Sequence, residues 1–226
     1  MIIIGYYTTD SVYESCFELL EKSLIRAGHR YSFKAIPPSD WKSATDLKPK
    51  IVLEQLEQFQ EPVLYLDVDA FVHENLDQYF ADKDCDIAVN YLRKKTGEEE
   101  LLSGTVYFAY SEKVLSLVRA WKEVGENNPL LNDQQALQQA VQEFEDELKV
   151  YRLSAAFTYI FDRVYEDVKR PVIEHLQASR EIYCRNDMKT LKNRLKKFMG
   201  LKVHKAELLK RRHQRVAELN KVFLDV

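Results

Sequence analysis

Short apolar runs alternate with helix-like segments along most of this 226-residue chain, and no other feature restricts its fold as much. The runs that read as strands are residues 2–7, 31–36, 63–66, 86–91, 105–110, 150–153 and 171–176. Such alternation is typical of a mostly parallel sheet with helices on both faces. We therefore predict an α/β fold, in which ligands bind at the carboxyl ends of the strands.

Helix start and stop signals fall between these runs. Ser11, with Glu14 three residues later, predicts a capping box, and Gly28 is placed to end that helix. Further helices are expected to begin near three residues, Pro49, Ser111 and Asn132.

Composition excludes several classes of protein. The chain is 46% hydrophobic and 31% charged, which favours one ordered domain over disorder. No stretch approaches the ~20 apolar residues of a membrane span, and the first residues lack a signal-peptide pattern. Three cysteines far apart in sequence argue against disulfides and fit a reducing compartment, so we expect a cytoplasmic protein. Glycine-rich dinucleotide and P-loop motifs and the H-E-x-x-H motif are absent.

The charge is distributed unevenly. Residues 185–226 hold 13 Lys or Arg against 4 Asp or Glu, a balance of +9. Because the whole chain has a net charge of −3, residues 1–184 carry a net charge of −12. This change predicts two parts, an acidic domain of residues 1–184 and a basic extension of residues 185–226.

The basic extension carries apolar residues at helical spacing, from Met188 to Met199 and again from Leu209 to Phe223. One interpretation is an amphipathic surface for anionic lipid or a lipid-linked acceptor, with peripheral association at the inner face of the membrane. The other, which we favour, is a pair of helices that pack on the acidic domain. Aromatic residues are too sparse among the basic ones to favour nucleic acid.

Two aspartates follow the buried run 63–66 directly. Asp67 and Asp69 therefore lie at the predicted ligand-binding edge of the sheet. Isolated buried carboxylates are costly, and two so close repel each other unless a cation lies beside them. Their oxygens suit hard ions such as Mg²⁺ or Mn²⁺, which commonly bind phosphate as well. The alternative is that both residues simply stabilise a turn.

Several segments, in order, resemble the nucleotide-sugar glycosyltransferases of the GT-A fold, a Rossmann-like fold. The resemblance covers about residues 2–180 and is close to the glycogenin-like and bacterial lipooligosaccharide galactosyltransferase group. The similar segments are YYTTDSVYESCFELLEKSL, LKPKIVLEQLEQFQEPVLYLDVDAFVHENLDQYF, LLSGTVYFAYSEKV, NDQQAL and PVIEHLQASR.

The resemblance implies a metal site. Asp67 would touch the ribose or the metal, Asp69 would bind the metal, and His175 would complete the ligand set from a distant strand. Two carboxylates and a neutral imidazole suit Mn²⁺, with Mg²⁺ as the alternative. A single strand histidine is more often hydrogen-bonded to backbone, which is the ordinary explanation of His175.

The resemblance also implies contacts with the nucleotide. Thr8 and Tyr13 match the uridine-binding opening of the family, although Tyr13 could equally pack on its helix. A lysine near Pro49 would reach the phosphates, and either Lys48 or Lys50 fits. Arg180 would pair with diphosphate oxygens, unless it is a solvated surface arginine.

Residues near the sugar follow from the same resemblance. Ser103 and Gly104 would lie beside it, and Asp133 and Gln134 would face its hydroxyls or the reacting carbon. Helix capping is the ordinary explanation of the latter two. The chain departs from the family at Leu102, where the family carries asparagine, which puts in doubt any contact made by that side chain.

The implied reaction is metal-dependent transfer of a sugar, with retention, from a nucleoside-diphosphate sugar such as a UDP-sugar to a glycan or glycolipid. Two alternatives stay open. One is a phosphatase or phosphotransferase with Asp67 as nucleophile and Asp69 as acid, although Phe71 and Val72 fit that class poorly. The other is a non-catalytic relative that only binds nucleotide-sugar, supported by Leu102 alone.

Overall fold

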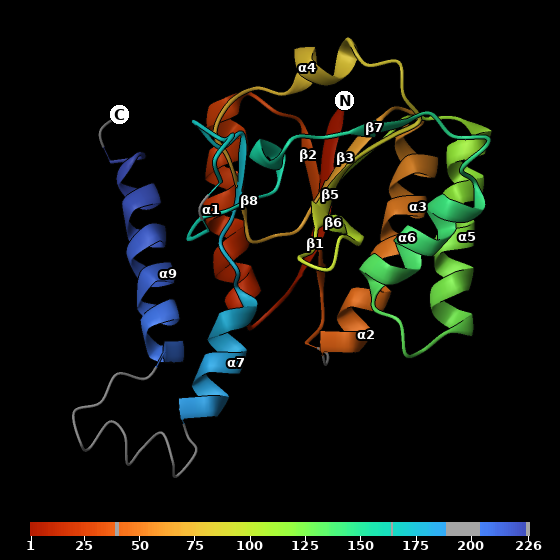
Figure 1. Cartoon of the computed structure of the whole chain (residues 1–226). Helices are drawn as coiled ribbons and strands as arrows, with labels where there is room; N and C mark the ends of the chain where they lie inside the picture. Colours follow the sequence, from red (N-terminus) through yellow and green to blue (C-terminus); the bar gives the residue numbers. More distant parts are fainter. Residues whose placement is uncertain (39–40, 164, 189–203, 225–226) are drawn as a thin grey trace.

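A six-stranded sheet forms the centre of the molecule in this computed structural model, which describes residues 1–38, 41–163, 165–188 and 204–224 (Figure 1). Its order is β2-β1-β3-β6-β5-β7. The strands are β1 (Ile2–Thr8), β2 (Tyr31–Ile36), β3 (Val63–Leu66), β5 (Ile87–Arg93), β6 (Glu99–Phe108) and β7 (Val150–Arg152).

Five of these six strands run in the same direction. β1 is parallel to β2 and β3, and β7 is parallel to β5. β6 is antiparallel to β3 and β5 because it returns directly from β5 through a hairpin. The prediction of a mostly parallel sheet is confirmed, with β6 as the exception.

Three helices pack on one face of the sheet. They are α3 (Lys48–Phe59), α5 (Glu112–Asn127) and α6 (Asp133–Glu143), on the right of Figure 1. Alternate strand residues such as Ile2, Ile4 and Tyr65 point toward them, and Trp121 of α5 is 1% exposed in this core. The short α2 (Trp41–Asp46) precedes α3.

The opposite face is covered by α1 (Val12–Ala27) and a second, three-stranded sheet. The sequence predicts one of its strands, within residues 171–176, but as part of the main sheet. This small sheet has the order β4-β9-β8, with β4 (Ala70–Val72), β9 (Ile173–His175) and β8 (Tyr159–Ile160). β4 and β8 have three and two residues, which is too short for a recognisable period. α4 (Asp77–Ala81) and a 3₁₀ turn (Ala155–Phe157) complete the layer.

Helix ends follow the sequence signals closely. Asn132 and Gln135 form a complete capping box, and Gly28 ends α1 in the left-handed region, at φ 75°. Ser11 caps α1 as predicted, but Glu14 accepts a hydrogen bond from the backbone of Asp10 and not of Ser11. Asp10 has φ 53°, and that turn brings its amide over the helix end.

The C-terminal part contains α7 (Ser179–Met188) and α9 (His204–Lys221), which lies beside α7 and α1 (Figure 1). α7 continues through the predicted boundary at residue 184, and the division into two parts stays a prediction. The apolar positions expected between residues 189 and 199 lie outside the described residues. No helix of the described ranges is long and apolar enough to cross a membrane.

Candidate active site

A pocket of about 330 Å³ opens where β1 and β3 end. The starts of α3, α6 and α7 and the end of β9 contribute to its walls. Most of the site residues predicted from the sequence meet at this pocket. Nine of them line it: Thr8, Tyr13, Lys48, Asp67, Asp69, Ser103, Asp133, Gln134 and His175. Gly104 lies directly behind Asp67 and His175. The ligand-binding edge expected of an α/β sheet is therefore the location of the pocket.

Three possible metal ligands converge in this pocket. Asp67, Asp69 and His175 each offer one atom, and these atoms lie within 4.8 Å of one another. His175 Nδ1 is 3.8 Å from Asp69 Oδ1. Asp67 and Asp69 come from the turn after β3, and β4 pairs Ala70 with His175, so the small sheet joins the two halves of the group.

The remaining polar atoms of these side chains are already bound by the protein. Asp69 Oδ2 accepts a hydrogen bond of 2.7 Å from the amide of Ala178. His175 Nε2 lies 2.9 Å from the hydroxyl of the fully buried Thr105. With Nε2 protonated and donating to Thr105, Nδ1 presents its lone pair to the pocket, as in a ligating histidine.

Gly104 makes room for this group. A Cβ atom there would lie 2.9 Å from Asp67 Oδ2 and 3.1 Å from His175 Cε1. The distance to Asp67 is shorter than any that Cβ atoms ordinarily make with a non-bonded atom. Any larger residue would therefore displace the carboxylate or the imidazole. The absence of a side chain at Gly104 fits a donor set of two carboxylates and one imidazole around a divalent ion.

Lys48 is buried beneath the pocket between two carboxylates. Its Nζ is 3.0 Å from Asp67 Oδ1 and 2.7 Å from Asp133 Oδ2, and 3.3 Å from the hydroxyl of Ser103. Tyr65 donates a further hydrogen bond to Asp67 Oδ1, at 3.0 Å. Lys48 therefore ties the end of β3 to the start of α6.

The charges of this cluster shift the pKa values of its members. Burial acts to lower the pKa of Lys48, but Asp133 and Asp67 outweigh it, so this pKa lies above its usual value. Burial acts to raise the pKa of Asp133, but Lys48 and the Ser103 hydroxyl outweigh it, so that pKa lies below its usual value. Both groups are consequently ionised at neutral pH.

Gln134 is oriented by contacts on both sides. Its Oε1 accepts a hydrogen bond from the amide of Ser103, at 3.3 Å, and its Nε2 donates to Glu100, at 2.9 Å. Ser103 also donates its hydroxyl to Asp133 Oδ2, at 2.8 Å. The start of α6 is thus held against β6 by the residues predicted to lie near the sugar.

The opposite end of the pocket is formed by the β1–α1 connection. Thr8 shares a hydrogen bond of 2.8 Å with Ser11, the residue that caps α1. Tyr13 stands in the first turn of that helix and lines the pocket together with Tyr6 and Tyr7. Burial, followed by the charges of Asp69 and Asp67, raises the pKa of Tyr13, so its hydroxyl stays protonated.

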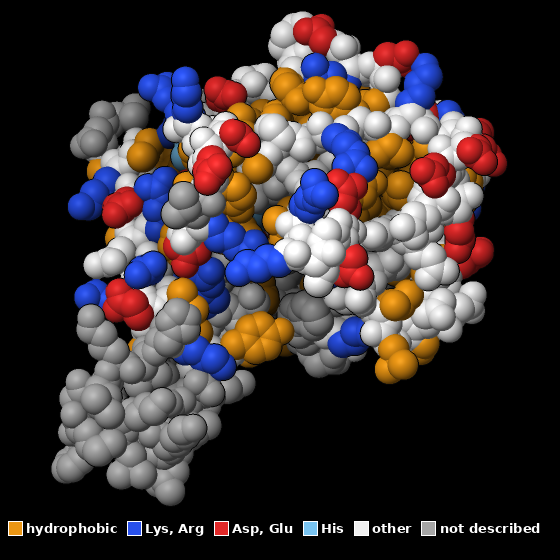
Figure 2. Space-filling view, in the orientation of Figure 1, with side chains coloured by type: hydrophobic (Ala, Val, Ile, Leu, Met, Phe, Trp, Pro, Cys, Tyr) orange, Lys and Arg blue, Asp and Glu red, His pale blue; other side chains and the backbone are white. Residues whose placement is uncertain are grey.

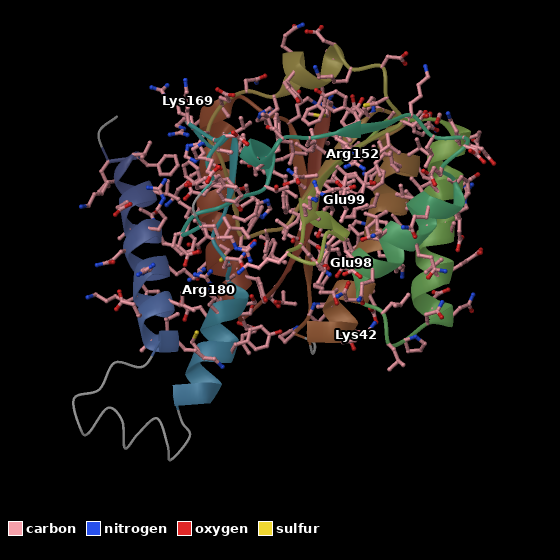
Figure 3. All side chains as sticks on the ribbon, viewed as in Figure 1. Lys42, Glu98, Glu99, Arg152, Lys169 and Arg180 are labelled. Carbon is pink, nitrogen blue, oxygen red and sulfur yellow. The ribbon has the colours of Figure 1, made fainter. Side chains whose placement is uncertain are left out.

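Two predicted phosphate-binding residues lie away from the pocket walls. Lys50 is exposed and its Nζ is 3.9 Å from Glu54, so Lys48 is the lysine that reaches the site. Arg180, at the N-terminal end of α7 (Figure 3), makes two hydrogen bonds to Asp162, at 2.6 and 2.9 Å. Contact of Arg180 with a diphosphate stays a prediction.

Sequence reasoning missed several residues of the site. Tyr65 precedes Asp67 by two positions, so the period of a strand places both on one side, and this signal was available. Thr105 follows Gly104 in β6, but its contact with His175 joins residues 70 positions apart. Gln177, in the loop after β9, and Ser179, the first residue of α7, also line the pocket, and no pattern marks them.

A family comparison decides the class of the protein. The model of the nucleotide-diphospho-sugar transferase family matches residues 10–191. The chain belongs to this family. Because the match spans most of the chain, this nucleotide-diphospho-sugar transferase is a glycosyltransferase, and the phosphatase alternative falls away. A search of curated proteins found no match.

Solved structures share the fold of this transferase. A glycosyltransferase involved in glycosylation of the major capsid of PBCV-1 matches with a TM-score of 0.60 and 15% identity, over 78% of this chain and 94% of that one. The apo-form glycosyltransferase GlyE of Streptococcus pneumoniae TIGR4 matches with a TM-score of 0.51 and 18% identity, over 77% and 53%. These likenesses confirm the predicted GT-A architecture.

Proposed function

We propose that this transferase moves a sugar from a UDP-sugar to a glycan or glycolipid acceptor, with a divalent ion held by Asp67, Asp69 and His175. The observation that carries the proposal is the convergence of these three side chains in the pocket, each with another atom already bound by the protein. Mn²⁺ suits this mixed set of oxygen and nitrogen donors, and Mg²⁺ is the alternative.

The protein residues would act mainly by positioning and electrostatics. When bound, the ion would neutralise the charge that develops on the departing diphosphate. Lys48 keeps Asp67 and Asp133 in place, and Asp133 and Gln134 would orient the sugar from the α6 side. Thr8 and Tyr13, at the other end of the pocket, would hold the nucleoside, with the Tyr13 ring against the base.

Thermal stabilisation by donor and metal together tests this function. The protein is melted with UDP, UDP-glucose or UDP-galactose, with Mn²⁺ or with EDTA. Larger stabilisation by a uridine nucleotide with metal than with EDTA is the expected result, because a bound ion would add contacts between the diphosphate and the protein. Asp69→Ala should lose this coupling, whereas Asp167→Ala, a change at an exposed aspartate, should keep it. Equal coupling in both variants would refute the metal site.

Retention of anomeric configuration is the second part of the proposal. Its support is the resemblance of the motifs to retaining transferases. Time-resolved proton NMR of the product, with an α-linked UDP-hexose as donor, distinguishes the outcomes: an α-linked product supports retention and a β-linked product shows inversion.

We also propose that the basic C-terminal part brings the enzyme to anionic membrane surfaces. Residues 185–226 carry a balance of +9, and Figure 2 shows Lys and Arg gathered over the side formed by α7 and α9. The apolar residues Leu209 and Leu219 of α9 are buried against the protein, so the attraction would be electrostatic and depend on exposed residues such as Lys210 and Lys221.

Sedimentation with phosphatidylserine vesicles tests the membrane proposal. The double change Lys210→Glu and Lys221→Glu should reduce the bound fraction at low salt, because each basic residue contributes about 1 kcal/mol near such a surface. A change of the same charge at Arg93 and Lys95, which are exposed on the β5–β6 hairpin, is the control. Equal binding by both double variants would exclude this surface.

A further inference from the structure

α9 covers the back of the small sheet whose front carries the metal-binding group. Leu219 of α9 packs with Phe71 of β4 and with Leu176, which follows β9, and Val216 and Phe223 extend this contact. Successive residues of a strand point to opposite sides, so Phe71 and Glu174 share the α9 side and His175 points away from it.

A buried carboxylate lies at the centre of this contact. Glu174 is 1% exposed. Arg215 of α9 binds it in a fork, with Nε 2.7 Å from Oε1 and Nη2 2.8 Å from Oε2. His73, the residue after β4, is 3.0 Å from the same Oε2. Glu174 of β9 is thus linked to the end of β4 through His73 and to α9 through Arg215.

These connections converge on the backbone that presents the metal ligands. Glu174 immediately precedes His175, and β4 immediately follows Asp69. A backbone hydrogen bond also joins the two segments directly, because the amide of Leu176 donates to the carbonyl of Asp69 at 2.9 Å. A shift of β9 against β4 would therefore change the separation of the Asp69 and His175 side chains.

We propose that α9 sets the geometry of the metal site and that Arg215 is a positioning residue, acting on His175 and Asp69 through Glu174. The inference rests on the proposed metal function. It concerns a helix that lies beyond residues 10–191, the part matched by the family, and so assigns a role in the site to the C-terminal extension.

Arg212 gives α9 a second buried attachment close to the first. Its Nη1 is 2.8 Å from Glu181 of α7, and its Nη2 is 3.1 Å from the sulfur of Cys16 in α1. Arg212 itself is 5% exposed. The orientation of α9 is thus set by ion pairs on two elements, which allows the Arg215 fork to hold the small sheet in one position.

Mn²⁺ binding in the presence of UDP tests the proposal, measured by the loss of the EPR signal of free Mn²⁺. Arg215→Gln should weaken Mn²⁺ binding about tenfold, the scale for residues that orient metal ligands. Arg215→Lys keeps the charge but not the fork and should give an intermediate loss. Arg211→Gln removes the same charge from an exposed position of α9 and should bind as the wild type does.

UDP affinity in EDTA separates positioning from general destabilisation. It should be unchanged in every variant, because the β1–α1 end of the pocket does not contact Arg215, whereas a loosened protein would lose metal and nucleotide binding together. The proposal is wrong if Arg215→Lys binds Mn²⁺ as tightly as Arg211→Gln, and this comparison holds even if Arg215→Gln does not fold. A wild-type protein without Mn²⁺ binding would instead refute the proposed function.

Discussion

At the residue scale, the site depends on polar atoms that have few alternative partners. Lys48 contacts two carboxylates and Ser103, and Asp67 receives hydrogen bonds through one oxygen while the other faces Gly104. Changes of one or two atoms at these positions should therefore alter binding without altering the fold.

Gly104→Ala should abolish metal-dependent stabilisation by UDP and leave the protein folded. The new methyl group would lie 2.9 Å from Asp67 Oδ2, the end of a movable side chain, so the carboxylate rotates and the backbone stays. Gly125→Ala is the control, because the nearest atom to its new methyl is 3.9 Å away and alanine favours a helix by up to about 1 kcal/mol. Melting of both variants with Mn²⁺ and UDP checks the prediction; full coupling in Gly104→Ala would contradict it.

Acid sensitivity should reveal the Lys48–Asp133 pair. The pKa of Asp133 is lower in the folded protein than in the unfolded chain, so its contribution is complete above the unfolded value, about 4, and is lost as pH falls through the folded value. Asp133→Asn should lower the free energy of unfolding at pH 7 by about 2 kcal/mol, and this deficit should shrink toward pH 3. Urea titrations from pH 7 to 3 measure it. A deficit that stays constant over this range would contradict the assignment.

At the element scale, caps and strands place the site, and the sequence predicts them unequally. Ser11, Gly28 and Asn132 mark helix ends because capping is chemistry between near neighbours. The reversed direction of β6 has no such signal, since alternation of side chains is the same for both directions of a strand. The small sheet is not predicted as a separate unit, although β9 lies within a predicted strand, because β4 and β9 pair across more than 100 positions and β4 and β8 contain only three and two residues.

Asn132→Ala should reduce both stability and turnover. Loss of the capping box costs about 1 kcal/mol and frees the first turn of α6, which carries Asp133 and Gln134. Ser111→Ala removes the cap of α5, at similar cost but away from the pocket, and should leave turnover unchanged where both variants are folded. Initial rates of UDP release, with melting temperatures, distinguish them. Equal turnover in the two variants would show that α6 needs no cap to hold its residues.

At the scale of the whole molecule, the C-terminal part shows what charge composition leaves undetermined. The excess of Lys and Arg predicts a separate basic extension, and favours helices packed on the acidic domain without indicating where they bind. In the structure, the buried Arg212 binds Glu181 and the half-buried Arg215 binds Glu174, and both glutamates belong to residues 1–184. Charge composition cannot identify such pairs, because Arg215 and Glu174 are 41 positions apart in sequence.

Removal of α9 should therefore destabilise the rest of the protein. A chain that ends at residue 203 loses the pairs of Arg215 with Glu174 and of Arg212 with Glu181, and uncovers Leu19, Phe71 and Leu176. A lost pair costs about 3–5 kcal/mol where the remaining carboxylate stays buried, and less where water reaches it. Since a typical domain is stable by only about 5–15 kcal/mol, we expect the shortened chain to melt near or below room temperature and to bind a hydrophobic dye.

Neutral replacements test which of these two losses dominates. In the shortened chain, Glu174→Gln with Glu181→Gln removes the charges that have lost their arginines but not the uncovered apolar surface, so the melting temperature should rise while dye binding persists. The same two changes in the full-length protein deprive Arg212 and Arg215 of their carboxylate partners in the domain and should lower its melting temperature. If the replacements fail to stabilise the shortened chain, burial of Leu219 and its apolar neighbours, and not the ion pairs, is what attaches α9 to the domain.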